Sequence, residues 1–328
     1  MRARIAIVST CYPRDPGDAS GHFVRTEARE LHRAGHDVHV FAPGSGQSDE
    51  STGRVHWLGD RGAFGWPGAL PRLKEKPLRA LGALEFALRA QRAVREHGPF
   101  AQLQAHFLVP SGWPIATLAL GARAETKLEI VGHGSDVRVF CRLPKQLRKH
   151  IARGWLARRA QLRVTSQELA ALLGQANPEL LPALRVAASP FDVDGVPDRR
   201  SARARLGFAD SAVIALVVSR LVPSKRVSLA LHALALLDDL SVVVVGDGPE
   251  LAALSARFPS VRFTGRVPRA DALRYIAAAD VLVSASAQEG APTVVREARQ
   301  LGVPVVAVAA GDLALWAERD PGILLTRA

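Results

Sequence analysis

The chain has 328 residues, 48% of them hydrophobic, which excludes a disordered protein and allows two domains with ordinary cores. Its formal net charge of +12 is uneven, because 27 of the 43 Lys and Arg residues but only 16 of the 31 acidic residues lie in the first 190 positions. The two cysteines, Cys11 and Cys141, exclude a disulfide scaffold and suit a reducing compartment. We expect a cytoplasmic protein whose N-terminal half meets a negatively charged partner.

The first 43 residues predict a strand, a helix and a second strand. RIAIVST (Arg4–Thr10) and HDVHVFAP (His36–Pro43) resemble buried strands, and VRTEARELHRAG (Val24–Gly35) has a helical pattern that stops at a glycine. Polar residues follow the first strand at once, unlike in a signal peptide, and no run approaches the roughly 20 apolar residues of a spanning helix. We expect a βαβ opening in a protein that is soluble or at most peripheral on a membrane.

Two stretches of the middle of the chain are irregular. Residues 45–80 are interpreted as loops on the acceptor side of the first domain. SPFDVDGVPDRRSARA (Ser189–Ala204) carries Pro, Gly and charge without an apolar period, so it is interpreted as a linker. Its Asp192–Asp194 pair has the spacing of a metal-binding D-x-D motif, but the position in a linker favours a structural role.

A basic segment precedes this linker. Cys141–Arg163 holds eight Lys and Arg residues and no acid, with Leu147, Ile151, Trp155 and Leu162 at roughly helical spacing. We interpret it as an amphipathic helix that rests on anionic lipid and presents the acceptor. A solvated helix face is the alternative.

After Asp210 strands and helices alternate regularly. Continuous Val-rich strands separated by helices predict a parallel sheet covered on both faces. The expected strands are 212–219, 240–246, 261–265, 281–286 and 303–308, and the expected helices are 227–237, 249–258, 270–280 and 292–302. We expect two doubly wound Rossmann-like domains, residues 1–188 and 205–328, joined by the linker 189–204 and facing each other across a cleft, with ligands beyond the carboxyl ends of the strands.

Two turns at these strand ends are suited to phosphate. Arg220 and Lys225 lie just past the strand 212–219, where two cations can bind a diphosphate, although a solvated loop would carry the same residues. In VGDGPE, Gly246 and Gly248 allow a tight turn before a helix. Leu251 stands where a dinucleotide fingerprint needs its third glycine, so this signal is weak and disfavours a dinucleotide oxidoreductase.

The turn EGAPTVV, with two glutamates eight residues apart, points to a nucleotide sugar. Pro292 suits the first helical position, so the amides of Gly290–Val294 can face an anion. Glu289 lies beside that anion and Glu297 more than a turn further along the helix. Because carboxylates do not bind phosphate, both glutamates are expected to accept hydrogen bonds from sugar or ribose hydroxyls.

Taken together, these blocks resemble a known family. SRLVPSK, VVGDGPE, VRFTGRV and AADVLVSASAQEGAPTVVREARQLGVPVVA resemble the C-terminal domain of the family 4 retaining glycosyltransferases of GT-B fold, whose hallmark is the E-x7-E motif, here Glu289 to Glu297. STCYPRDPGDASGHFVRTEARELHRAGHDVHVFAPG, QAHFLVPSGWPIA and GHGSDV resemble the branch that builds bacterial cell-surface polysaccharides, such as teichuronic acid glycosyltransferases.

The resemblance implies a role for each matching residue. Arg220 and Lys225 would bind the donor diphosphate, Glu297 the ribose, and Glu289 and His133 the transferred sugar. The other implied donor-binding residues are Gly21, Arg266, Val267, Gly290, Ala291, Pro292 and Thr293. For His133 a structural histidine is the alternative.

The chain departs from the family pattern at three places. Ser20–Gly21 and Ala310–Gly311 stand where the family usually has paired glycines. The chain also stops at PGILLTRA, whereas relatives continue through helices that cross back onto the N-terminal domain. We therefore expect a C-terminally short chain whose domains hinge more freely, with stability or activity dependent on a partner.

The expected activity is retaining transfer of a sugar from a UDP- or GDP-linked donor to a saccharide or polyprenyl-diphosphate-linked acceptor in cell-envelope polysaccharide synthesis. We expect no metal, no cofactor, no dedicated enzymic nucleophile and no nucleic-acid partner. The location would be cytoplasmic, with the inner face of the cell membrane as a site of peripheral attachment. Two alternatives stay open: an inactive nucleotide-sugar binder or membrane-associated partner, and a nucleotide-sugar 2-epimerase on the same fold, which would form product without an acceptor.

Overall fold

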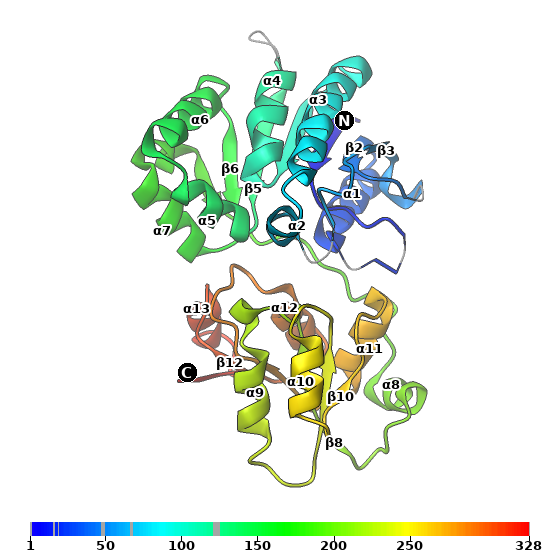
Figure 1. Ribbon diagram of the computed structural model, residues 1–328. Helices are drawn as coiled ribbons and strands as arrows, with labels where there is room; N and C mark the ends of the chain where they lie inside the picture. Colours follow the sequence, from blue (N-terminus) through cyan, green and yellow to red (C-terminus); the bar gives the residue numbers. More distant parts are fainter. Residues whose placement is uncertain are drawn as a thin grey trace. The chain divides into compact units, whose positions relative to one another are not determined.

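The computed structural model describes residues 2–15, 17–18, 20–46, 50–65, 68–120 and 125–327. It divides into two compact units, Met1–Pro190 and Phe191–Ala328. Each unit is built around one sheet in which every paired strand is parallel, with helices packed against it (Figure 1). The expectation of two α/β Rossmann-like domains is therefore confirmed.

The sheet of the first unit has the order β3-β2-β1-β4-β5-β6-β7. The order reverses between β1 and β4, which is the usual place for a ligand in such a sheet. Its strands are β1 Arg4–Ser9, β2 Asp37–Pro43, β3 Arg54–Leu58, β4 Gln102–His106, β5 Lys127–Gly132, β6 Gln161–Val164 and β7 Leu184–Val186.

Helices cover the buried strands of the first unit. Ile5 and Ile7 of β1 pack with Val24 and Ala28 of α1, whereas Ala6 and Val8, which point to the other face, join the larger core that includes Phe86 of α3. The helices are α1 His22–Arg33, α2 Ala69–Glu75, α3 Arg79–His97, α4 Thr117–Ala119, α5 Ser135–Arg142, α6 Lys145–Ala157 and α7 Gln167–Ala176.

The sheet of the second unit has the order β10-β9-β8-β11-β12-β13, with the reversal between β8 and β11. Its strands are β8 Val213–Val218, β9 Leu240–Val245, β10 Arg262–Phe263, β11 Val281–Ser284, β12 Val305–Val308 and β13 Ile323–Thr326. The expected strands of this half are confirmed within one or two residues at most ends, because runs of valine and isoleucine with buried side chains mark them.

Three hydrophobic clusters lie among the described residues of the second unit, and the two larger ones pack against its sheet. Leu231 of α9 and Leu254 of α10 pack with Val217 and Val244, and α11 and α12 contribute to a second cluster with Ile214. The helices are α8 Arg199–Leu206, α9 Val227–Leu234, α10 Leu251–Arg257, α11 Arg269–Ala278, α12 Thr293–Gln300 and α13 Leu313–Ala317.

The interpretation of residues 45–80 as loops was wrong in part. Strand β3 pairs with β2 from His39↔Arg54 to Pro43↔Leu58, and helix α2 lies within the same stretch. The short RVHWL segment has no clear strand pattern in the sequence, and it forms a strand because its backbone hydrogen-bonds to β2. Residues 47–49 and 66–67 of the stretch lie outside the described residues.

The expected linker is shorter than proposed. Helix α8 begins at Arg199, where the Asp198 side chain accepts a hydrogen bond from the Ser201 amide and so caps the helix. Arg203 is buried and pairs with Asp280, which fixes α8 to the second unit. Residues 199–204 are therefore part of that unit.

The amphipathic helix proposed over Cys141–Arg163 was also wrong in extent and orientation. The segment contains the end of α5, all of α6 and the start of β6. Ile151 and Trp155 are fully buried in the protein core, and Leu162 lies in the sheet. The apolar side of α6 therefore faces protein, because an apolar helix stripe has the same spacing whether it meets a core or a lipid.

No helix among the described residues is long and apolar enough to cross a membrane.

Candidate functional site

Loops at the carboxyl edge of the second sheet hold one another through backbone hydrogen bonds. The Leu221 amide, after β8, donates to Asp247 O, after β9, over 2.9 Å. The Ala287 amide, after β11, donates to Ser224 O, also over 2.9 Å. Three strands therefore present their terminal loops as one connected surface.

Gly311 joins the loop after β12 to this surface. Its φ is +59°, and an added Cβ would lie 2.3 Å from Gly290 O, so only glycine allows the two loops to approach this closely. The retained glycine of the Ala310–Gly311 pair is thus the one that the geometry requires.

Lys225 and Glu289 meet at the centre of this edge. Lys225 Nζ lies 2.5 Å from Glu289 Oε1, and both side chains are mostly shielded from solvent. Arg220 stands exposed in the same loop as Lys225, directly after Ser219, whose amide donates to Val245 O. The structure therefore gathers two cations and a carboxylate where β8 and β11 end.

Glu297 lies on α12 and is buried. Arg269 Nη1, at the start of α11, lies 2.7 Å from Glu297 Oε1, so the two side chains form an ion pair. Burial raises the pKa of Glu297, and the charge of Arg269 opposes that effect. A carboxylate has several lone pairs, so Glu297 can also accept from a ligand hydroxyl.

Helix α12 supplies the amides that the turn sequence predicted. It begins at Thr293, and Pro292 is its N-cap rather than its first helical residue. Gly290 is buried and Ala291 and Thr293 are half-buried beside Glu289. The first turn of α12 contains no acid, so its N-terminus favours an anion.

Arg266 and Val267 lie in the segment between β10 and α11. The Gly246 amide donates to Gly265 O over 3.0 Å, which joins this segment to the loop after β9. Arg266 is exposed, and Val267 packs against the core of the unit. The predicted site residues of this half therefore lie on the loops that follow the strands or, like Glu297, in helix α12.

In the first unit, Gly21 precedes α1 at the carboxyl edge of β1. Its φ is +69°, and an added Cβ would lie 2.3 Å from Cys11 O. The backbone of the loop after β1 is thus closely packed against the start of α1. In the Ser20–Gly21 pair, the glycine thus occupies the position at which a side chain would not fit.

His133 follows β5 at the same edge. Its ring centroid lies 4.5 Å from that of Phe23 on α1 and 4.8 Å from that of Phe107. Asp136 accepts from the His133 and Gly134 amides and so fixes the turn. Burial lowers the pKa of His133 to about 3, and the charge of Arg163 adds to this effect, so the ring is neutral at pH 7.

A series of buried polar side chains contacts His133. His106 Nδ1 lies 3.0 Å from His133 Nε2, and His106 Nε2 lies 3.9 Å from Glu27 Oε2. Glu27 in turn pairs with Arg163, which also pairs with Glu129. Sequence reasoning missed these four residues, because they are distant in the chain and meet only where α1, β4, β5 and β6 pack.

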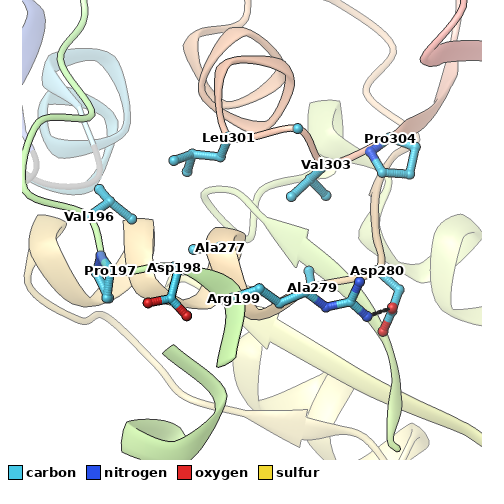
Figure 2. Close-up of a pocket in the computed structure, with 11 residues that line it drawn as sticks. Val196, Pro197, Asp198, Arg199, Ala277, Ala279, Asp280, Leu301, Val303 and Pro304 are labelled. Atoms are coloured by element: carbon cyan, nitrogen blue, oxygen red, sulfur yellow. Dashed lines mark hydrogen bonds and ion pairs between the residues drawn. The ribbon is translucent and has the colours of Figure 1, made fainter. Parts of the chain in front are cut away.

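A hollow of about 250 Å³ lies elsewhere in the second unit. Figure 2 shows its lining, in which Arg199 points to Asp280 beside Pro304. Asp280 and Pro304 precede β11 and β12, so this hollow is at the amino edge of the sheet. It is thus not part of the group of residues around Lys225 and Glu289.

Comparison with known proteins identifies the family. Residues 198–315 match the model of the glycosyl transferases group 1, and residues 20–180 match that of glycosyltransferase family 4. The chain belongs to the group 1 glycosyltransferases of family 4. It is accordingly a glycosyltransferase, as the sequence predicted.

Two relatives match this glycosyltransferase over most of its length. A teichuronic acid biosynthesis glycosyltransferase of Bacillus subtilis (strain 168) is 29% identical over 326 residues, which is 94% of this chain and 82% of the relative. A GDP-mannose-dependent alpha-mannosyltransferase of Mycobacterium tuberculosis is 28% identical over 315 residues, 94% of this chain and 79% of the relative.

A solved structure shares the fold. Anabaena HepE in complex with UDP and glucose superposes with a TM-score of 0.71 at 20% identity, covering 99% of this chain and 86% of HepE. The GT-B class expected from the sequence is thereby confirmed.

Proposed function

We propose that this glycosyltransferase takes its sugar from a nucleotide-diphosphate donor held at the carboxyl edge of the second sheet, and transfers it with retention of anomeric configuration. The observation that carries the proposal is the 2.5 Å contact between Lys225 and Glu289, beside the N-terminus of α12. The cation, the carboxylate and the helix N-terminus there match the diphosphate and hydroxyl groups of one ligand.

The diphosphate is assigned to Arg220, Lys225 and the amides of Gly290–Thr293. Negative charge grows on the diphosphate as the bond to the anomeric carbon breaks, and these groups stabilise that charge without reorganising. A bound diphosphate also competes with Glu289 for Lys225. The contact seen between the two residues therefore keeps the lysine in place before the donor arrives.

The ribose is assigned to Glu297, a buried carboxylate on α12. Arg269 pairs with it and opposes the rise in its pKa that burial causes. Ribose hydroxyls would donate to the lone pairs of the carboxylate that Arg269 leaves unused. Arg266 and Val267, on the segment joined to the loop after β9, are assigned to the base.

Following the family resemblance, Glu289 and His133 are both assigned to the transferred sugar, and Gly21 to the diphosphate. In the proposed step the bond from the anomeric carbon to the diphosphate oxygen breaks, and a bond to the acceptor oxygen forms on the same face. The acceptor proton passes to the leaving phosphate oxygen. No enzymic nucleophile is needed. His133 is neutral, and because its Nε2 is paired with His106, its Nδ1, which lies 3.4 Å from Ser189 Oγ, is the nitrogen proposed to bond a sugar hydroxyl.

The acceptor is proposed to be a saccharide or a polyprenyl-diphosphate-linked saccharide of the cell envelope. The relative from Bacillus subtilis that matches 94% of this chain is named for teichuronic acid biosynthesis, which supports this class. The donor nucleoside is proposed to be uridine or guanosine. The Mycobacterium tuberculosis relative is named as GDP-mannose-dependent, and HepE was solved with UDP.

An apolar stripe on α3 supports contact with a membrane. Leu81, Leu84 and Leu88 are each more than half exposed and share one face of the helix. Arg95 on the same helix donates to Leu118 O, and Leu118 is itself 50% exposed, so the stripe continues onto α4. Such an apolar patch on a monomer marks a contact surface.

Basic residues flank this stripe. Arg158, at the end of α6, donates to Thr117 O and Leu120 O, so it lies beside α4, as Arg95 of α3 does. Figure 1 shows α3, α4 and α6 as neighbouring helices of the first unit. We propose that the leucines enter the interface of an anionic membrane while the basic residues hold its headgroups.

The test of function is transfer with the purified chain. UDP- and GDP-sugars would be supplied with and without saccharide acceptors, and the anomeric configuration of the product would be read by proton NMR. The proposal predicts acceptor-dependent product that keeps the configuration of the donor. Inverted product contradicts retention, product without acceptor supports the epimerase, and binding without turnover supports the inactive binder.

A further inference from the structure

Three histidines of the first unit lie together. They are His39 on β2, His56 on β3 and His97 at the end of α3, and one ring nitrogen from each lies within 4.8 Å of the others. His39 Nδ1 is 3.0 Å from His56 Nε2. The ring centroids of His56 and His97 are 4.2 Å apart. Residues separated by 17 and 41 positions thus place three imidazoles around one point.

This cluster does not belong to the donor or acceptor site. His39 and His56 are each the third residue of their strands, and α3 runs back toward the amino edge of the sheet, where β4 begins. Gly21 and His133 follow the opposite ends of β1 and β5. None of the three histidines therefore has a role in the proposed transfer step.

A carboxylate stands behind one of the histidines. Asp37 Oδ2 lies 3.5 Å from His39 Nε2, on the far side of the ring from the nitrogen that faces His56. A metal-ligating histidine usually presents its other ring nitrogen to a carboxylate or carbonyl group in this way. Arg4 pairs with Asp37 over 3.1 Å and also approaches His39 Nε2, so the carboxylate is itself held in position.

Two of the rings already face each other nitrogen to nitrogen. His39 Nδ1 lies 3.0 Å from His56 Nε2, so the two rings share one hydrogen bond. A metal ion would take the place of the proton between these nitrogens, because neutral imidazole is the form that binds metals.

We propose that His39, His56 and His97 bind one divalent transition-metal ion of the zinc class. Imidazole nitrogens suit Zn²⁺, Co²⁺ and Ni²⁺, and three histidines leave a fourth position for water beside the exposed His97. The ion ties the edge strand β3 to the end of α3. Its role is structural, because it lies away from the edge that carries Gly21 and His133.

The test measures metal binding by the full chain without an affinity tag, after chelator treatment and dialysis. Co²⁺ would be followed by its visible absorption and Zn²⁺ by calorimetry. His97→Gln is the main variant because the side chain is exposed, and His56→Gln is the second. His32→Gln is the matched control, since His32 is an exposed histidine of α1 outside the cluster.

The proposal predicts one ion per chain and the intense visible spectrum of four-coordinate Co²⁺. Each cluster variant should bind about 100-fold more weakly, whereas His32→Gln should bind as the parent does. Asp37→Asn should weaken binding by about 10- to 100-fold, as loss of such a supporting carboxylate usually does. Zn²⁺ should raise the unfolding temperature of the parent but not of His97→Gln.

Absence of stoichiometric binding by folded parent protein would overturn the proposal and leave a stack of hydrogen-bonded imidazoles. Binding that both cluster variants retain would overturn it too, because the ion would then lie elsewhere. These readings are independent of glycosyl transfer, so failure here leaves the donor site untouched.

Discussion

Lys225 Nζ lies 2.5 Å from Glu289 Oε1, although the two residues are 64 positions apart and follow different strands, β8 and β11. The parallel pairing of β11 with β8 brings their carboxyl ends together, so the contact is a consequence of sheet order. It holds the lysine beside the N-terminus of α12. In the proposed donor complex, phosphate replaces Glu289 as the partner of the lysine, and Glu289 turns to the sugar.

Changing Lys225 to Ala should lower kcat as well as raise KM for the donor. The lysine is proposed to stabilise charge that grows as the sugar leaves, so its loss should cost on the order of 3 kcal/mol, about a hundredfold in rate. Steady-state kinetics with a UDP- or GDP-sugar would measure this. Arg205→Ala, an exposed charge change on α8, is the control and should match the parent. A Lys225→Ala enzyme with unchanged kcat would remove the lysine from the reaction.

Changing Gly21 to Ala should destabilise the first unit by about 3 kcal/mol, through backbone strain together with a collision with Cys11 O. Gly35→Ala is a matched control. Gly35 also has a positive φ, of +87°, but its Cβ would meet nothing within 4 Å, so strain alone should cost about 1 kcal/mol. Urea unfolding of both variants, followed by tryptophan fluorescence, would separate the cost of backbone strain from the cost of the collision with Cys11 O. Equal losses would show that close packing at Gly21 is unimportant.

The folded protein should lose stability as pH falls below about 6.5. The pKa of His133 is about 3 in the folded chain and near 6.5 when unfolded, so the unfolded state binds the extra proton in this window. The contribution of neutral His133 to the free energy of unfolding is complete above pH 6.5 and declines as the pH falls toward 3. Burial likewise holds the pKa of His106 well below its ordinary value.

Replacing His133 isolates its share of this pH dependence. The raised pKa of the buried Glu27 acts in the opposite direction, so the comparison must be with a variant and not with the parent alone. Between pH 7 and 5.5 the free energy of unfolding should fall by about 1 kcal/mol more in the parent than in His133→Gln. Urea titrations at both pH values would measure it, with His32→Gln as the control. Parallel losses in parent and His133→Gln would contradict a neutral, buried His133.

Changing Leu84 and Leu88 together to Ser should weaken sedimentation with anionic vesicles and leave transfer to a soluble acceptor unaltered. Both leucines are exposed on α3, so the chain should fold normally while apolar area is lost from the proposed membrane surface. The matched control is Leu236→Ser with Leu237→Ser, two exposed leucines of the second unit. Equal sedimentation of the two double variants, or of the parent with neutral and anionic vesicles at low salt, would refute the assignment.

Residues whose position depends on strand order could be predicted from the sequence. Apolar runs mark the strands, and Lys225, Glu289 and His133 each lie after the end of such a strand. Because parallel strands of one sheet end at a common edge, the meeting of Lys225 with Glu289 follows from the pattern of the chain alone. Gly21 and Gly311 were noted only as glycines retained from the family pattern, and the structure adds that the turns they form tolerate no side chain.

Residues whose position depends on how helices and sheets pack could not be predicted. The leucine and tryptophan spacing of α6 is the same for a lipid surface as for the protein core, and only the fold shows that Trp155 is buried. Arg269 reaches Glu297 because α11 and α12 lie side by side, a contact that no local motif encodes. The His39, His56 and His97 cluster arises in the same way, from strand pairing and the return of α3.

The most direct test of the donor site is calorimetric titration of UDP and GDP into the folded parent, Glu297→Gln and Glu289→Gln. Glu297 is assigned to the ribose, so its variant should lose affinity for the preferred nucleotide by about 10-fold or more, since each charge-assisted hydrogen bond contributes about 1.5 to 3 kcal/mol. Glu289 is assigned to the sugar, so its variant should bind the free nucleotide as the parent does while failing in transfer. Parental affinity in folded Glu297→Gln would contradict the assignment of the two glutamates and with it the proposed donor site.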